Sequence, residues 1–364
     1  MSEEKDWRKY GKKFVDRYLI DGLGGMALGL FATLLIGTII KQAGAFFPEG
    51  NTIGIFLMQI GQIATVLTGA GIAVGVANNL GASKLVLYSS ILNGMVGAYA
   101  TKLLSGVLIT EAGIVLSGPG DPMGAFVATV IGVELGRLVS GKTKLDILLT
   151  PAVTILSGCL VAVLIGPSLA NFNALLGEFI KNATDYQPLL MGIVISVAMG
   201  IFLTLPISSA AIGVILGLSG IAAGAATAGC CAQMVGFAVM SYRENKVNGL
   251  VAQGLGTSML QMPNIIKNPK IWLPPILASA VTGPLATVVF GLENVATGAG
   301  MGTCGLVGPL LMWQTMVEKS GSSIVVLIEI LLLCFVLPAV LTYLFAIPMR
   351  KMNWIKENDL KLQL

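Results

Sequence analysis

The sequence contains no histidine and few charged residues, and both features limit what the protein can be. Charged residues make up 11% of its 364 positions, against about 25% in a soluble domain. Without histidine, a zinc site would have to be built from five cysteines, and none of these is spaced as Cys-x-x-Cys. We therefore expect neither a metal site nor a cofactor.

The few charges are concentrated at the two ends of the chain. Sixteen of the 40 charged residues (22 basic, 18 acidic) lie in the first 17 and the last 15 positions. The remainder is rich in Gly, Ala, Leu, Ile and Val, and the mean hydropathy is +0.86. Its long apolar runs lack the alternation of barrel strands, and backbone groups in lipid must be satisfied within the chain. The sequence predicts an all-α polytopic membrane protein.

Eleven apolar stretches approach the roughly 20 residues that a helix needs to cross a bilayer. They are Tyr18–Ile40, Ile53–Ala77, Leu85–Ile109, Met123–Val139, Ile147–Leu169, Leu189–Leu205, Ile207–Met240, Val247–Met262, Ile271–Leu292, Val295–Val317 and Ile324–Ile347. Basic residues flank the first and the last stretch, so the positive-inside rule places both termini in the cytoplasm and requires an even number of crossings. We expect about ten transmembrane helices and one or two re-entrant hairpins.

This pattern predicts three regions in the chain. Residues 1–17 form a cytoplasmic segment, 18–348 a transmembrane domain and 349–364 a cytoplasmic tail. Early loops agree with the orientation, since Lys84 and Arg137 fall inside, whereas Glu49 and Glu178 fall outside. A faint internal repeat, GLFATL at Gly29–Leu34 and GIFLTL at Gly200–Leu205, would relate oppositely oriented spans as in an inverted repeat, or is chance similarity.

The stretch Val295–Val317 is the best candidate for a re-entrant element. It contains GAGMGTCGLVGP, whose glycines and Pro309 interrupt a helix. Irregular backbone at membrane depth is tolerated only where protein or a water-filled cavity satisfies it. The segment and the residues just before it could bind a polar solute: Glu293, Asn294, Gly300, Gly302, Thr303 and Gly305. Alternatively, Glu293 is a solvated residue in an external turn.

Asn264 belongs to a second interrupted region, LQMPNIIKNPKIWLPP, which has four prolines between residues 260 and 275. There Asn264 could line a break in a helix and contact the same solute. The alternative is an ordinary cytoplasmic loop with Trp272 as an interfacial anchor.

A possible secondary polar site comprises Asn78, Asn79, Asp121 and Glu134. Asp121 precedes Pro122 and also suits a helix N-cap. Glu134 and Arg137 are three positions apart, so a local ion pair is the alternative for them. Further carboxamides lie in apolar segments, among them Asn93, Gln233, Gln253 and Gln261. Because these groups donate and accept hydrogen bonds, they favour an uncharged solute, although some must join helices to each other.

Three stretches carry a resemblance to a known family: Gly120–Ile155, Gln261–Asn294 and Gly298–Pro309. They resemble the second EIIC-type family of the phosphoenolpyruvate-dependent sugar phosphotransferase system, the PfoR-like membrane proteins. The resemblance implies a permease in a bacterial inner membrane that binds a sugar and passes it inward. It also implies a homodimer and separate cytoplasmic IIB and IIA partners, of which IIB would phosphorylate the sugar.

Three functions compete on this evidence. The first is a sugar permease, and the second is a membrane sensor that binds a similar solute without net transport. An intramembrane enzyme has little support, because the sequence shows no His-Glu-x-x-His motif, no serine and histidine pair and no paired aspartates.

Overall fold

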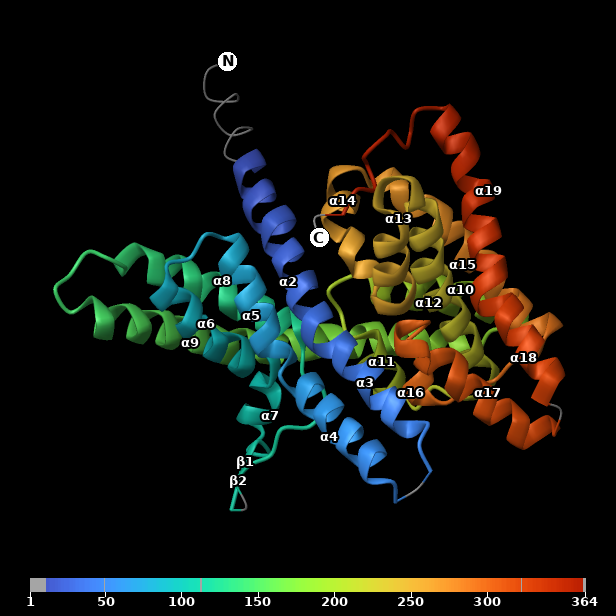
Figure 1. Ribbon diagram of the computed structural model, residues 1–364, viewed down its shortest axis with the longest axis horizontal. Coiled ribbons are helices and arrows are strands. Elements are labelled where there is room, and N and C mark those ends of the chain that lie inside the picture. The colour runs from blue at the N-terminus through green and yellow to red at the C-terminus, as the bar shows by residue number, and fades with distance from the viewer. Residues whose placement is uncertain (1–10, 49, 112, 322, 363–364) are drawn as a thin grey trace. The chain divides into compact units, whose positions relative to one another are not determined.

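The computed structural model describes residues 11–362 except 49, 112 and 322, and it confirms an all-α protein (Figure 1). In this described part, the strands are limited to a short hairpin of β1 (Ile109–Thr110) and β2 (Gly113–Ile114). The chain forms two compact units, one extending to Asn171 and one beginning at Phe172. Each unit is described by itself below.

Unit one begins with one helical run over Gly11–Ala45, followed by shorter helices. The run comprises η1 (Val15–Gly22), α2 (Leu23–Leu30), η2 (Phe31–Leu35) and α3 (Ile36–Ala45). After it come α4 (Thr52–Val66), α5 (Thr68–Asn79), α6 (Lys84–Ala98), α7 (Ala100–Leu104), α8 (Pro122–Val139) and the first part of α9 (Asp146–Thr184). In Figure 1, α2, α5, α6 and α8 lie next to one another in chain order, and these pairs are in contact.

Small residues set the packing of α2 against α5. Gly25 and Gly29, four residues apart, face Gly75 and Gly71, and a Cβ at any of these positions would collide with the opposite backbone. Close approach of backbones through such paired glycines is a common way for helices to associate in a membrane. These glycines therefore serve helix packing.

Unit two continues from the end of α9 and contains more interruptions. Its elements are α10 (Pro188–Thr204), α11 (Ser209–Ile215), α12 (Gly220–Met240), α13 (Tyr242–Val251), η3 (Ala252–Gly256), η4 (Ser258–Gln261), α14 (Met262–Lys267), η5 (Pro269–Trp272), α15 (Leu273–Pro284), η6 (Leu285–Val289), α16 (Ala296–Ala299), η7 (Cys304–Leu306), α17 (Val307–Ser320), α18 (Ser323–Leu331), η8 (Leu332–Val336) and α19 (Leu337–Lys351).

Helix α12 is the centre of unit two. It contacts α10, α15 and α19 (Figure 1), and 94% of its most apolar window is buried. The helix is rich in glycine and alanine, and Gly229 lies so close to Ser196 of α10 that no side chain fits between them. A helix that is apolar on all sides is expected to be enclosed by others, so α12 forms the core on which the polar residues of this unit are arranged.

The predicted spans agree with the structure in part. Six described helices are long and apolar enough to cross a bilayer, and the pair α4 and α5, bent by 50°, would make a seventh. The number of ten crossings therefore stays a prediction. The expectation of a loop at Glu178 is wrong, because α9 continues to Thr184. The stretch Val247–Met262 is also interrupted, since it comprises part of α13, a π-helix and a 3-10 turn.

The positive-inside rule places the start of the first predicted span and the ends of the second and fourth on the same side of the membrane. In unit one these three helix ends lie together. Arg17 from η1 and Arg137 from α8 both donate to the carbonyl oxygen of Leu80, which ends α5, at 3.2 and 3.1 Å. The predicted register of these three spans is thereby supported. That this face is cytoplasmic stays a prediction.

Candidate functional site

The glycine-rich segment Gly298–Pro309 is not a continuous helix. It consists of the end of α16, a turn, the 3-10 helix η7 and the start of α17. Gly302 and Gly305 have φ values of +53° and +52°, and Leu306 adopts the left-handed region at +61°, which is costly for a residue with a side chain. The predicted interruption of the helix is thereby confirmed. The predicted site residues of this segment are buried: Gly300, Gly302, Thr303 and Gly305.

Asn294 fixes the beginning of this segment against α12. Its side chain is 1% exposed. Its amide nitrogen donates to Thr227 Oγ1 of α12 at 2.8 Å and to the carbonyl oxygen of Gly308 at 3.0 Å, and its Oδ1 accepts from the N–H of Val295 at 2.8 Å. Asn294 thus connects the backbone just before the glycine-rich segment to Gly308 at the far end of that segment.

Glu293 points to a different partner. Its carboxylate forms an ion pair with Lys319 of α17 at 2.5 Å, and the side chains are 24% and 62% exposed, respectively. Glu293 is therefore a partly exposed, paired residue, while its neighbour Asn294 is enclosed.

The segment Ala252–Gln261 connects several polar groups of unit two, and we call it the hub. Its π-helix ends at Gly256, Thr257 is extended, and η4 follows. Gly254 accepts a hydrogen bond at 2.5 Å from Thr303 of the glycine-rich segment, and the Ser258 hydroxyl lies 2.8 Å from that of Thr204 in α10. The hub therefore joins the glycine-rich segment to the helices around α12.

Gln233 forms a buried polar group beside the hub. Its Oε1 accepts from Trp272 Nε1 at 2.9 Å and from the Thr204 hydroxyl at 3.4 Å, and its Nε2 donates to Ser279 Oγ at 3.3 Å. Gln233 and Ser279 are completely buried. Trp272 is thus bound to the core of the unit, in addition to any interfacial role.

Three carboxamides form a chain from the hub outward, which we call the carboxamide cluster: Gln253, Gln261 and Asn264. Gln261 donates to Gln253 Oε1, and Asn264 donates to Gln261 Oε1, both at 2.8 Å. The first two side chains are completely buried and Asn264 is 6% exposed. Asn264 is therefore connected through Gln261, Gln253 and the adjacent Gly254 to Thr303, a second predicted site residue.

The C-terminal tail covers this cluster. Gln261 and Asn264 donate to the carbonyl oxygens of Leu360 and Lys361 at 3.0 and 2.9 Å. Asn245 donates to Leu360 O and accepts from the N–H of Leu362, at 2.8 and 2.9 Å. The apolar side chains of the tail are also buried: Ile355, Leu360 and Leu362. The described part of the tail thus packs on unit two as a series of turns.

The secondary polar set of unit one is not one site. Glu134 accepts from Arg17 at 2.5 Å and lies 3.7 Å from Arg137, so it belongs to an ion-pair network at a helix end. Asn79 donates to Asp21 O at 3.1 Å, and Asn78 is exposed.

Asp121 lies at the other end of α8, about 20 Å from Glu134 along the helix axis at 1.5 Å per residue. It is the N-cap, and its side chain accepts from the N–H of Met123 at 3.0 Å. Burial raises the pKa of Asp121, and hydrogen bonds from the backbone of Met123 and Gly124 oppose the shift. The alternative structural roles of Asp121 and Glu134 are thus the ones that the structure shows.

The arrangement in unit two suits recognition of an uncharged polar molecule. Its buried groups are carboxamides, hydroxyls, peptide groups and an indole N–H, which donate and accept hydrogen bonds without carrying charge. Interrupted helices that present such groups within an apolar bundle are typical of membrane proteins that bind solutes. The fold and these groups therefore define a polytopic helical membrane protein with uncharged polar residues buried beside interrupted helices.

The comparison with protein families identifies its class more closely. The chain belongs to the family described as Phosphotransferase system, EIIC, whose sequence model matches residues 20–362. No curated protein matches the chain. Membership makes the protein a sugar permease subunit of the phosphotransferase system, located in a membrane and working with cytoplasmic IIB and IIA proteins.

Sequence reasoning missed the hub. It lies within Val247–Met262, one of the predicted apolar stretches, although this stretch contains the run Gln253–Ser258 (QGLGTS). Two glycines followed by two hydroxyl residues are a signal for a broken helix with polar groups at the break.

Proposed function

We propose that the protein binds a neutral, sugar-like solute in unit two and moves it inward across a bacterial inner membrane. The observation that carries this proposal is the hub, whose polar groups connect the glycine-rich segment, the Gln233 group and the carboxamide cluster. Sugars present several hydroxyls that donate and accept, and buried carboxamides match such groups well.

Within this proposal, the solute replaces hydrogen bonds that the protein now makes to itself. Gln253, Gln261 and Asn264 pair with each other and with the tail. Leaving such groups unpaired costs about 1–3 kcal/mol each, so the cluster is expected to open only as solute enters. Displacement of the tail would accompany opening, because the tail occupies two of the three carboxamides.

The proposed setting follows from the distribution of charge and from the family. Both termini lie in the cytoplasm, the protein forms a homodimer, and a separate IIB protein phosphorylates the sugar on the cytoplasmic side. The solute contacts are assigned to Asn264, Asn294, Glu293, Thr303 and the backbone of Gly300, Gly302 and Gly305.

Uptake of labelled sugars into proteoliposomes tests the function. The protein would be reconstituted with the cytoplasmic phosphotransferase proteins and phosphoenolpyruvate inside the vesicles, and a panel of sugars offered outside. Accumulation of sugar phosphate that requires IIB supports the permease. Saturable binding without flux, whatever IIB is present, would instead indicate a sensor.

A pair of variants tests the assignment of Glu293. Glu293→Gln and Lys319→Gln both break the same ion pair, but only the first alters a proposed solute contact. We expect Glu293→Gln to weaken sugar binding by roughly tenfold, the value of a lost hydrogen bond to a charged group, and Lys319→Gln to have a smaller effect. Equal effects of the two variants would remove Glu293 from the site.

A further inference from the structure

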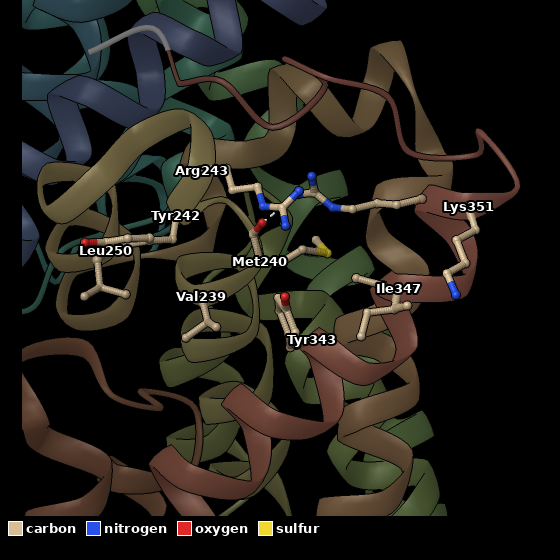
Figure 2. Close-up of a pocket in the computed structure, with 10 residues that line it drawn as sticks. Val239, Met240, Tyr242, Arg243, Leu250, Tyr343, Ile347 and Lys351 are labelled. Atoms are coloured by element: carbon tan, nitrogen blue, oxygen red, sulfur yellow. Dashed lines mark hydrogen bonds between the residues drawn. The ribbon is translucent and has the colours of Figure 1, made fainter.

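A cavity of about 610 Å³ lies where α12 and α19 end (Figure 2). The two helices pack together, and their ends lie side by side. Arg350 at the end of α19 donates to the carbonyl oxygen of Met240, the last residue of α12, at 2.8 Å. Tyr242, Arg243 and Leu250 from α13 complete the lining. This cavity borders the hub, since Gln253 donates to Ser241 Oγ between the lining residues Met240 and Tyr242, but its lining residues are not among those assigned to the proposed sugar site.

The cavity carries an excess of positive charge. Arg243, Arg350 and Lys351 line it. Among the residues that the structure describes, Glu244 is the acid that an ion pair brings to this group, at 3.5 Å from Arg350. Arg350 is therefore partly neutralised and also caps α12, a usual role for a cation at a helix C-terminus. Arg243 and Lys351 are exposed and add two further charges that this capping does not need.

The rest of the lining is apolar and aromatic. Val239, Ala346 and Ile347 come from the last turns of α12 and α19, both of which are candidate membrane spans. In Figure 2, Arg243 lies toward the upper left of the lining residues, Tyr343 at the lower centre and Lys351 at the far right. Tyrosines and basic residues at the ends of spans are typical of the level of lipid headgroups.

We propose that this cavity binds an anionic phospholipid, with the positive charges of Arg243 and Lys351 at its two sides attracting the headgroup phosphate and an acyl chain along Tyr343 and Ile347. Guanidinium groups form directed hydrogen bonds to phosphate oxygens, and basic pockets between spans on the cytoplasmic side are suited to lipid headgroups. The two components of the lining, cationic at the helix ends and apolar below them, match the two parts of a phospholipid. A free phosphate ion would use only the first.

Native mass spectrometry of the detergent-solubilised full-length protein tests this site. Dioleoylphosphatidylglycerol would be titrated against dioleoylphosphatidylcholine, and inorganic phosphate offered as a competitor. The variant R243Q/K351Q is compared with K356Q/K361Q, which removes the same charge from exposed lysines of the tail. We expect tight binding of phosphatidylglycerol to weaken roughly tenfold in the first variant and by less than about twofold in the second.

A third variant, R243K/K351R, separates lost charge from misfolding and should retain binding. The site is overturned if phosphatidylcholine binds as tightly as phosphatidylglycerol, or if both glutamine variants lose binding equally. Full displacement of phosphatidylglycerol by millimolar inorganic phosphate would show that the cavity binds soluble phosphate and would contradict the proposed lipid site. Loss of binding in R243K/K351R together with a normal unfolding temperature would also contradict the proposal.

Discussion

The two units use their polar residues in different ways. In unit one, buried Asn93 donates to Thr154 O at 2.9 Å and fits against Gly132 and Gly158, so it joins neighbouring helices. Glu134 is occupied by arginines at a helix end. In unit two, Gln253 and Gln261 lie in interrupted backbone and bond to each other, and Gln233 of α12 is linked to the same segment through Thr204 and Ser258. The same types of residue hold helices together in one unit and line a break in the other.

This difference indicates where a solute can bind. Regular helices satisfy their own backbone groups, so a polar side chain between them serves packing. Broken helices expose peptide groups that require partners, and a solute can provide them. Substitutions in each unit test this comparison, and they are given below from the largest expected effect to the smallest.

The largest effect is expected at the glycine-rich segment. Gly302 has φ +53°, and a Cβ there would lie 2.9 Å from Cys230 of α12. Gly302→Ala should lower the free energy of unfolding by about 1–3 kcal/mol, the range for overpacking, and reduce uptake more than roughly tenfold. Gly217→Ala is the control, since Gly217 has φ +58° in open space. Similar losses in both variants would show that backbone strain, and not the close packing of this segment, is responsible.

Release of the tail should expose the carboxamide cluster. Leu360 is completely buried, while the adjacent Lys361 side chain is exposed, so Leu360→Asp and Lys361→Asp form a matched pair. Burying a charge is costly, and Leu360→Asp is expected to detach the tail and raise labelling of Asn264→Cys by an impermeant maleimide about tenfold. An unchanged rate would mean that the tail does not cover the cluster in solution.

A smaller effect on stability, without a specific effect on solute binding, is expected in unit one. Glu134→Gln removes the charge that pairs with Arg17 and Arg137. Because these side chains are about one third exposed, we expect a loss of only about 1 kcal/mol, measured by thermal unfolding. Asp16→Asn, at an exposed position in the same helix as Arg17, is the control and should have little effect. A selective loss of sugar affinity in Glu134→Gln would restore this residue to the solute site.

The smallest effect is expected for Asn78→Ala. Asn78 is exposed on α5, and its neighbour Asn79 bonds to the backbone of Asp21. Equilibrium binding of labelled sugar should change by less than about twofold, as for surface substitutions in general. A tenfold loss would place part of the site in unit one.

Much of the fold follows from patterns that the sequence shows directly. Asp121 and Pro122 mark the beginning of α8, and the glycines before Pro309 mark a broken segment. Both predictions are confirmed because local chemistry decides them: a cap needs an acceptor, and glycine favours turns. The predicted stretch Ile147–Leu169 is shorter than α9 because the apolar run ends at Leu169, whereas the helix continues through more polar residues to Thr184. Both Pro151 and Pro167 lie inside it, and neighbouring helices can tolerate such prolines in a membrane protein.

The site was predicted less completely than the fold. Asn264 and Thr303 are linked through Gln261, Gln253 and Gly254, and the contact that completes this connection joins Thr303 to Gly254 across 49 positions. The position of the tail is equally non-local, since Asn245 meets Leu360 across 115 positions. Pairings of this kind depend on how the helices are packed, which periodicity and composition do not encode.

The central claim is that the solute binds among the interrupted helices of unit two. Photo-crosslinking with a diazirine analogue of the transported sugar, followed by mass spectrometric mapping, tests it most directly. We predict labelled peptides from the hub, the carboxamide cluster and residues 294–309, and protection by excess unlabelled sugar. Protectable labelling confined to residues before 171 would contradict the account.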